Sequence, residues 1–258
     1  MAPKTDLMQE ERHQVILRYV LTHRLARIKD LAANLKVHEM TIRRDVDTLA
    51  EQGLLERIHG GARLKNQAGA ELSYQLRAAQ NTEAKAKIAQ SALSLIEEGD
   101  TVALDASTTG LALAHILGTK PAMAIVTGLD AAETLSTRGT PFILTGGVFH
   151  PHARSFLSLP GSSNLSHLHP DKVFFSAKGF TLKTGFTDAY LPEVEAKIRL
   201  IESASFVIAL LDHSKFGREA LGTITVLSKV DILITDQRPA PVFREALEIS
   251  GTRLLIAV

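Results

Sequence analysis

Near its N-terminus, the sequence carries a segment whose residue types and spacing suit contact with nucleic acid. Residues 40–49 read Met-Thr-Ile-Arg-Arg-Asp-Val-Asp-Thr-Leu. Ile42, Val46 and Leu49 recur at helical spacing and leave Arg43 and Arg44 off the apolar face. Guanidinium groups on the outer face of a helix can bind DNA phosphates or base edges. The segment therefore predicts a helix that binds nucleic acid.

The elements around this helix complete a small DNA-binding module. Residues 28–35 form a second amphipathic segment, and only a short polar turn at 36–38 separates the two. Helix, tight turn and helix is the spacing of a helix-turn-helix. Gln52-Gly53 then ends the second helix, and residues 54–64 read as a strand, a glycine turn and a returning strand. This hairpin predicts the wing of a winged helix-turn-helix.

The charge distribution supports the same interpretation. Residues 1–66 hold twelve Lys and Arg against nine Asp and Glu, whereas the remainder holds seventeen against nineteen. The positive charge lies where DNA would be bound. An ordinary surface helix with solvated arginines would explain the Arg-Arg pair alone, but not the whole unit.

The rest of the chain alternates between short apolar segments and helical patterns. Strands are expected at residues 101–105, 123–127, 141–145, 172–176, 206–211, 232–235 and 253–257, and helices at 83–98, 110–117, 129–135, 191–203 and 241–249. This alternation predicts an α/β fold, in which a parallel sheet is covered on both faces. We expect a DNA-binding domain at residues 1–64, a polar linker at 65–80 and a larger α/β domain at 81–258.

Polar residues follow several expected strands, at the sheet edge where ligands bind in such folds. The first strand runs into Asp105-Ala106-Ser107-Thr108-Thr109, and hydroxyls with free N–H groups at a helix N-terminus can bind phosphate. Other strands end in Thr127-Gly128, Thr145-Gly146-Gly147, Lys178-Gly179 and Asp212-His213-Ser214-Lys215. Each could be turn or N-cap chemistry alone. Together they favour one polyanionic, hydroxylated ligand.

Both parts of the chain resemble the DeoR-type transcriptional repressors. The resemblance rests on Arg12, Ile16, Val20, Thr41 to Val46, His59 to Ala62, Asp105 to Thr109, Thr127, Gly146-Gly147, Gly185, Glu195 to Lys197, Asp212 to Phe216 and Thr235-Asp236. It implies operator DNA as a partner and a sensor domain similar in fold to ribose-5-phosphate isomerase. It also implies a phosphorylated sugar as effector.

The pattern and the resemblance together assign the candidate site residues. Those expected at DNA are His38, Glu39, Thr41, Arg43, Arg44, Arg57, His59 and Arg63. The resemblance implies that Ser107, Thr108 and Thr109 hold the phosphate. It also implies that Lys197 and Lys215 neutralise it or bind sugar oxygens, and that Asp105 and Asp212 accept sugar hydroxyls. The remaining residues expected at the ligand are Thr127, Gly146, Gly147, His150, Lys178 and Gly179.

The chain departs from the family pattern at three positions. His38 stands where a Ser usually caps the recognition helix, a cap typically worth about 1 kcal/mol. Either Glu39 shifts the helix start, or the His38 ring meets DNA. The family commonly has Gly at the position of Ala106 and Asn at that of Gly128, which leaves the identity of the sugar open.

Two other function classes compete with this one. A sugar-phosphate isomerase or deaminase could use Glu195 as a base, but an acid at a helix start is favoured by the dipole, and an enzyme has no evident use for residues 1–66. Metal-dependent regulation is suggested by His150-Pro151-His152 and His167-Leu168-His169. Without cysteines or a dense acidic cluster, contact of His150 with the effector is preferred. No catalytic residue, metal or cofactor is expected.

We therefore expect a repressor of a sugar catabolic operon that a phosphorylated sugar releases from its operator, with corepression by the sugar left open. A homodimer or homotetramer is expected, because one module reads too few base pairs. No apolar segment approaches the roughly 18 residues of a membrane span, and no apolar signal core follows Met1. We expect a cytoplasmic protein with no membrane partner.

Overall fold

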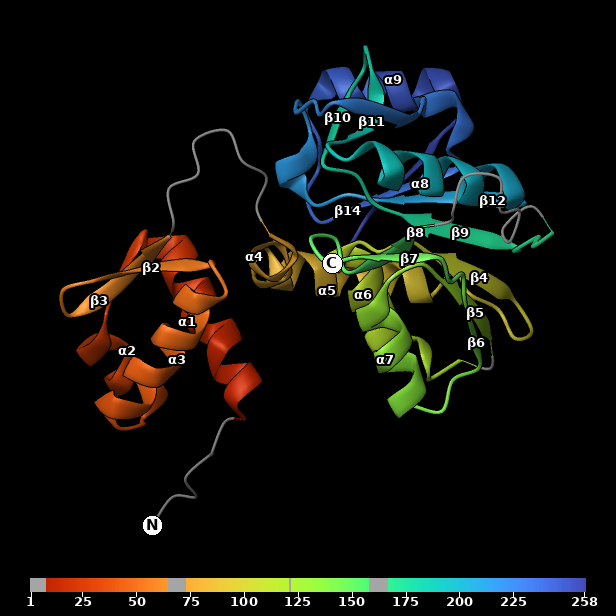
Figure 1. Ribbon diagram of the computed structural model, residues 1–258. Helices are drawn as coiled ribbons and strands as arrows, with labels where there is room; N and C mark the ends of the chain where they lie inside the picture. Colours follow the sequence, from red (N-terminus) through yellow and green to blue (C-terminus); the bar gives the residue numbers. More distant parts are fainter. Residues whose placement is uncertain (1–7, 65–72, 121, 158–166) are drawn as a thin grey trace. The chain divides into compact units, whose positions relative to one another are not determined.

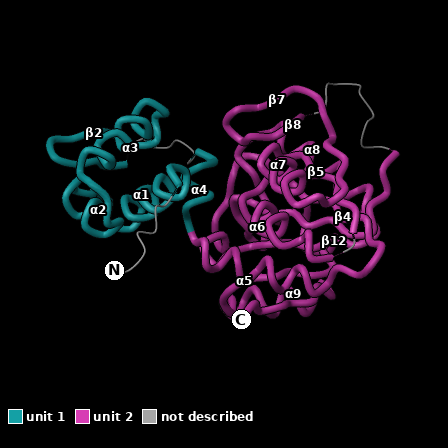
Figure 2. Tube along the Cα trace, turned by 90° about the horizontal axis from the view of Figure 1, so that it is seen from below, with its two compact units in different colours: residues 1–80 teal, residues 81–258 magenta. Residues whose placement is uncertain are grey.

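Helices α1, α2 and α3 and a small antiparallel sheet form the N-terminal part of the computed structural model (Figure 1). The structure describes residues 8–64, 73–120, 122–157 and 167–258, and it divides into unit 1, residues 1–80, and unit 2, residues 81–258 (Figure 2). The elements of unit 1 are α1 (Gln9–His23), β1 (Leu25–Arg27), α2 (Ile28–Leu35), α3 (Glu39–Glu51), β2 (Leu55–Ile58), β3 (Gly61–Leu64) and α4 (Tyr74–Ala79). Winged helix-turn-helix architecture is thus confirmed.

The apolar faces of these helices meet in one core. Ile16, Ile42 and Val46 are fully buried there, as the helical spacing of the apolar residues predicts. The wing is the β2–β3 hairpin, with strand order β1-β3-β2. A side chain at Gly61 would place its Cβ 2.2 Å from the carbonyl oxygen of Ala26. Only glycine lets the wing pair this closely with β1.

Part of the segment expected to be a linker is helical. Helix α4 begins after Ser73, whose hydroxyl accepts a hydrogen bond from the backbone N–H of Leu76. Leu76 and Ala79 are buried in the core of unit 1, so α4 belongs to this unit. Six residues are too few to show a helical period in a sequence. The other residues of the expected linker, 65–72, lie outside the described part of the chain.

In the described part of unit 2, seven parallel strands form one sheet in the order β15-β14-β12-β9-β4-β5-β6. They are β4 (Thr101–Leu104), β5 (Met123–Val126), β6 (Phe142–Leu144), β9 (Lys172–Phe175), β12 (Phe206–Leu210), β14 (Ile232–Thr235) and β15 (Arg253–Ile256). Each coincides with a strand expected from the sequence, because continuous apolar segments of this length are typical of buried parallel strands. The chain runs outward from β4 to β6, returns to β9 beside β4, and continues to the other edge. In sheets of this kind ligands bind at such a switch point, which lies here at the carboxyl ends of β4 and β9.

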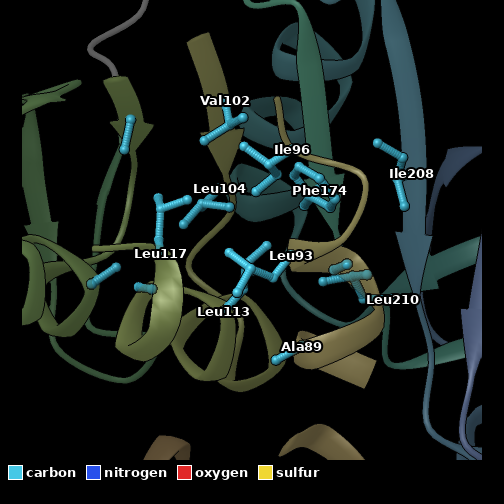
Figure 3. Packing of buried hydrophobic residues seen from close by; sticks show 14 of the residues in the cluster. Ala89, Leu93, Ile96, Val102, Leu104, Leu113, Leu117, Phe174, Ile208 and Leu210 are labelled. Atoms are coloured by element: carbon cyan, nitrogen blue, oxygen red, sulfur yellow. The ribbon is translucent and has the colours of Figure 1, made fainter. Parts of the chain in front are cut away.

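Helices cover both faces of the sheet (Figure 1). On one face lie α5 (Thr82–Leu93), α6 (Thr108–Leu117) and α7 (Leu129–Thr137). Figure 3 shows their side chains Leu93 and Leu113 close to Leu104 and Phe174 of the sheet. On the other face lie α8 (Leu191–Ser203), α9 (Pro241–Ser250) and an antiparallel sheet of β10 (Gly179–Thr181), β11 (Gly185–Asp188) and β13 (Gly222–Thr225). The α/β fold class is thus confirmed.

Some elements differ from their expected limits. Helix α5 ends at Leu93 rather than residue 98, because the N–H groups of Leu95 and Ile96 bond to carbonyls three residues back, which tightens the chain into turns. The sequence patterns do not reveal the strands β10, β11 and β13. They also miss β7 (Val148–His150), β8 (Ser155–Leu157) and the 3₁₀ turns η1 (His213–Lys215) and η2 (Leu227–Lys229). Among the described residues, no helix is long and apolar enough to cross a membrane.

Candidate functional site

The outer face of α3 carries the arginines that the sequence assigns to DNA. Arg43 and Arg44 are exposed, whereas Ile42 and Val46 on the opposite face are buried. Arg43 lies 3.6 Å from the carboxylate of Glu39, one turn earlier, with both side chains open to solvent. Such an exposed pair contributes at most about 1 kcal/mol, so it leaves Arg43 able to turn to a phosphate. Thr41 is half-buried beside them.

His38 is the N-cap of α3. Its Nδ1 accepts a hydrogen bond from the backbone N–H of Met40 at 3.2 Å, and the helix begins at Glu39. The imidazole thus takes the place of the serine hydroxyl that commonly caps this helix. The proton of the neutral ring must then be on Nε2.

Asp45 holds the recognition helix to α1, a role that sequence reasoning missed. Its carboxylate is 2% exposed and accepts two hydrogen bonds from Arg12, at 2.8 and 3.1 Å. His13 Nε2 lies 3.2 Å from the same carboxylate. A charged residue on the apolar face of a predicted helix is the signal that would have shown this contact, because a buried charge needs a partner.

The basic residues of the wing are paired with acids in the free protein. Arg57 of β2 bonds to Asp47 of α3 at 2.5 Å, and Arg63 of β3 bonds to Glu56 at 2.9 and 3.0 Å. About half of each guanidinium-bearing side chain is exposed. Both arginines can therefore exchange their carboxylate partners for DNA phosphates at little cost in free energy. His59 is exposed in the turn of the wing.

At the switch point of the large sheet, Asp105 ties several segments together. Its Oδ1 accepts from the N–H of Ser107 at 3.2 Å, and its Oδ2 accepts from the N–H of Ser176 at 3.0 Å. Oδ2 also lies 3.2 Å from Lys197 Nζ. Asp105 is 1% exposed. It thus joins the loop after β4 to the loop after β9 and to α8.

Lys197 donates hydrogen bonds to two protein oxygens and forms an ion pair with a third. Its Nζ lies 2.9 Å from the carbonyl of Ser176, 2.6 Å from Asp188 Oδ2 and 3.2 Å from Asp105 Oδ2. Burial disfavours the charged ammonium, but the carboxylates of Asp188, Asp105 and Glu193 outweigh it and raise the pKa of Lys197. Burial likewise opposes the ionised form of Asp188, yet Lys197 and Lys178 hold its pKa below the ordinary value. Lys197 therefore neutralises carboxylates of its own domain.

The buried acid on α8 is Glu193. Its Oε1 accepts a hydrogen bond from the Ser155 hydroxyl of β8, and burial raises its pKa, against the attraction of Lys197. Glu195, the carboxylate considered as a base from the sequence, is exposed. Sequence reasoning did not single out Glu193. Its spacing from Lys197, one helical turn, is the signal that places both on the buried face.

Replacement of Glu193 with glutamine tests whether burial raises the pKa of this carboxyl group. Because the folded pKa of Glu193 is raised, the folded state holds the proton more tightly and the parent loses stability as pH rises above the ordinary value of 4.5. The amide introduced by Glu193→Gln keeps the Ser155 bond without titrating. We expect the unfolding free energy of the parent to fall relative to Glu193→Gln by up to about 1.4 kcal/mol per pH unit above this point. Urea unfolding from about pH 4 to 8 measures it. The exposed control Glu195→Gln should show a constant difference, and a constant difference for Glu193→Gln would disprove the assignment.

The residues that follow β4 begin helix α6. Ser107 is its N-cap, and its hydroxyl accepts from the N–H of Gly110 at 2.9 Å. Thr108 is half-buried and Thr109 is buried. The sequence left two interpretations of this segment open, N-cap chemistry and a phosphate site. The role of Ser107 agrees with N-cap chemistry. The first turn of α6 nevertheless stands at the switch point with the positive end of its dipole toward the sheet edge.

A second polar cluster surrounds Asp212, after β12. Its Oδ1 accepts from the N–H and the hydroxyl of Ser214 and from Asn81 Nδ2 at 2.9 Å. Lys215 Nζ lies 3.9 Å from Oδ2. Burial opposes ionisation of Asp212, but Lys215, the Ser214 bonds and Lys85 lower its pKa. Lys85 is buried as well. Sequence reasoning missed it, because the pattern of a helix does not show that one of its residues interacts with Asp212, far along the chain.

The other residues assigned to the ligand lie at different strand ends. Thr127 is buried after β5, and Gly146 and Gly147 after β6 have φ of 68° and 105°. Lys178 is half-buried after β9, and a Cβ on Gly179 would lie 2.3 Å from the carbonyl oxygen of Arg218.

The two histidine pairs were considered as a metal site. His150 stacks on Tyr190 with ring centroids 4.2 Å apart, and the ring centroid of His152 lies 6.0 Å from that of His150. In the part of the chain that the structure describes, no group of three residues could hold a metal ion. His150 thus packs against Tyr190 at the start of α8, whereas His152 is exposed.

Comparison with known proteins identifies both units. Residues 12–68 match the DeoR-like helix-turn-helix domain, and residues 80–237 match the DeoR C-terminal sensor domain. A solved ribose-5-phosphate isomerase A from Methanocaldococcus jannaschii is 19% identical, with a TM-score of 0.40, over 53% of this chain and 55% of that one.

Curated relatives extend over almost the whole chain. The regulator GolR of Listeria innocua is 33% identical over 96% of this chain and 98% of its own, and the repressor GlcR of Bacillus subtilis is 34% identical over 97% of each. The glycerol-3-phosphate regulon repressor of Escherichia coli is 32% identical over 90% of this chain and 93% of its own. All three are named as transcriptional regulators or repressors, which agrees with the expectation of a regulator rather than an enzyme. The chain is a DNA-binding transcriptional regulator that belongs to the DeoR family.

Proposed function

We propose that this protein represses a sugar catabolic operon and leaves its operator when a phosphorylated sugar binds to unit 2. The observation that carries the proposal is the first turn of α6, which presents Thr108 at the switch point between β4 and β9. This is the edge where ligands enter such sheets, and a helix N-terminus favours a phosphate. The name of the Escherichia coli glycerol-3-phosphate regulon repressor supports an effector with a phosphate group.

The burial of the candidate residues refines their roles. Asp105 and Lys197 bind one another and their neighbours, so they position the loops after β4 and β9 rather than contact the sugar. Thr108, half-buried Lys178 and Lys215 remain the groups best placed to meet it. An ammonium and a hydroxyl on one phosphate would form charge-assisted bonds.

A panel of sugar phosphates tests the proposal. One member should release the protein from a duplex selected from random DNA, and it should stabilise unit 2 by about 2.7 kcal/mol at a hundred times its dissociation constant. The unphosphorylated sugar should do neither. Gel shift and calorimetry measure the two effects.

Lys215→Ala should bind the same duplex as tightly as the parent but no longer respond to the effector. Lys87→Ala, which removes an exposed ammonium from α5, is the matched control and should respond as the parent does. An unchanged response of Lys215→Ala would place the effector site elsewhere. Tighter rather than weaker DNA binding with the sugar would make it a corepressor.

The proposal includes a cytoplasmic homodimer or homotetramer. Two helix-turn-helix units can read two half-sites only if their spacing matches, about 10 base pairs or a multiple between centres. Insertion of about five base pairs turns one half-site to the opposite face of the duplex and should abolish paired binding. Undiminished binding after that insertion, or a monomer on a single half-site in sedimentation, would contradict it.

A further inference from the structure

A hollow lies on the surface of unit 1 where α2 meets the start of α3. Apolar side chains and cations both line it: Ala33, Val37 and Met40, and Lys29, Lys36 and Arg43. Glu39 also belongs to the lining and pairs with Arg43. A surface that combines cations with an apolar patch suits DNA, whose phosphates are anionic and whose major groove is partly apolar.

Met40 is placed unusually for a large apolar residue of α3. Ile42, Val46 and Leu49 are buried, whereas Met40 is 54% exposed. Its position precedes Arg43 and Arg44 by three and four residues, so it shares their outer face. It also stands in the first turn, the part of a recognition helix that contacts base edges. Met40 therefore points into the surface that DNA would cover.

We propose that Met40 contacts the C5 methyl group of one thymine in the operator, and so determines specificity at one base pair. Thymine is the base that presents a methyl group in the major groove, where an apolar side chain recognises it. The thioether side chain is flexible and polarizable, and adapts to such a contact. The inference rests on the DNA-binding role of α3.

The test removes single methyl groups from the DNA. Full-length protein selects a duplex from random sequences, and each thymine of that duplex is replaced in turn by deoxyuridine. At one position we expect the parent to bind about fourfold more weakly, the factor that corresponds to one buried methyl group. Met40→Ala should bind the thymine and deoxyuridine duplexes equally at that position. Its melting temperature should equal that of the parent, because the side chain is exposed.

Two control variants separate this role from a general effect. Met123→Ala removes a methionine of similar exposure from unit 2 and should keep the full deoxyuridine effect. Arg43→Ala should bind both duplexes more weakly yet preserve their ratio. The proposal is overturned if Met40→Ala keeps the deoxyuridine effect at every position, or if the parent shows none. A parent that selects no duplex at all would overturn the DNA-binding role itself.

Discussion

Replacement of Lys197 with methionine is expected to destabilise unit 2 by about 3–5 kcal/mol, the usual effect of removing one partner of a buried ion pair. The ammonium-bearing residue is 4% exposed and lies between the carboxylates of Asp105 and Asp188. Without it, two buried carboxylates of like charge face each other. At neutral pH the loss should be complete, since the raised pKa of Lys197 and the lowered pKa of Asp188 keep both ions charged. Urea unfolding followed by circular dichroism measures the change.

Two further variants make this result specific. Lys87→Met removes an ammonium whose side chain is 43% exposed and which lies 3.7 Å from Glu83, and should change stability by less than about 0.5 kcal/mol. Asp188→Asn added to Lys197→Met should recover part of the loss, since residues of one network are not additive. A Lys197→Met protein within about 1 kcal/mol of the parent, a margin well below the expected effect, would refute the buried network.

The second large effect is expected from Arg12→Ala. Asp45 is 2% exposed and would lose its guanidinium partner while keeping the contact with the His13 ring, so unit 1 should lose about 3–5 kcal/mol. Operator affinity should fall with it, because α3 is no longer fixed to α1. Thermal unfolding and gel shift at the same temperature measure the two losses.

Arg18→Ala on the exposed side of α1 is the control. It should leave the stability of unit 1 and the operator affinity near those of the parent. The double change Arg12→Met with Asp45→Leu removes both charges and should restore stability, as apolar replacement of a buried pair often does. If Arg12→Ala alone melts like Arg18→Ala, the pair does not hold the helices together.

Sequence patterns located continuous apolar strands and amphipathic helices, and failed on short elements that show neither pattern. Continuous apolar segments revealed every strand of the large sheet, because such strands are buried on both faces. Helix α4, the β7–β8 hairpin and the sheet of β10, β11 and β13 were missed, because segments of three to six residues that are not continuously apolar show no clear pattern. Their place is set by tertiary contacts, such as the hydrogen bond between Ser155 and Glu193.

The candidate site could be proposed from the sequence as a set of residues, which stays a prediction, but its contacts could not. Sequence order showed that polar residues end the strands, and the family resemblance assigned Lys197 to the ligand. The contacts of Lys197 with Asp105 and Asp188 depend on how distant segments meet, which no local pattern contains. The burial of Asp45 and Glu193 could have been predicted, because helical spacing puts each on the buried face of its helix.

Helix α8 is bonded to four separate segments of unit 2. Lys197 binds the loops after β4 and β9 and the end of β11, and Glu193 binds β8. A ligand that displaced this helix would have to break these bonds together, since packed interiors switch between discrete arrangements rather than deform by degrees. We therefore expect the transcriptional response of one protein molecule to be all-or-none, with graded gene expression arising only from the fraction of molecules that have switched.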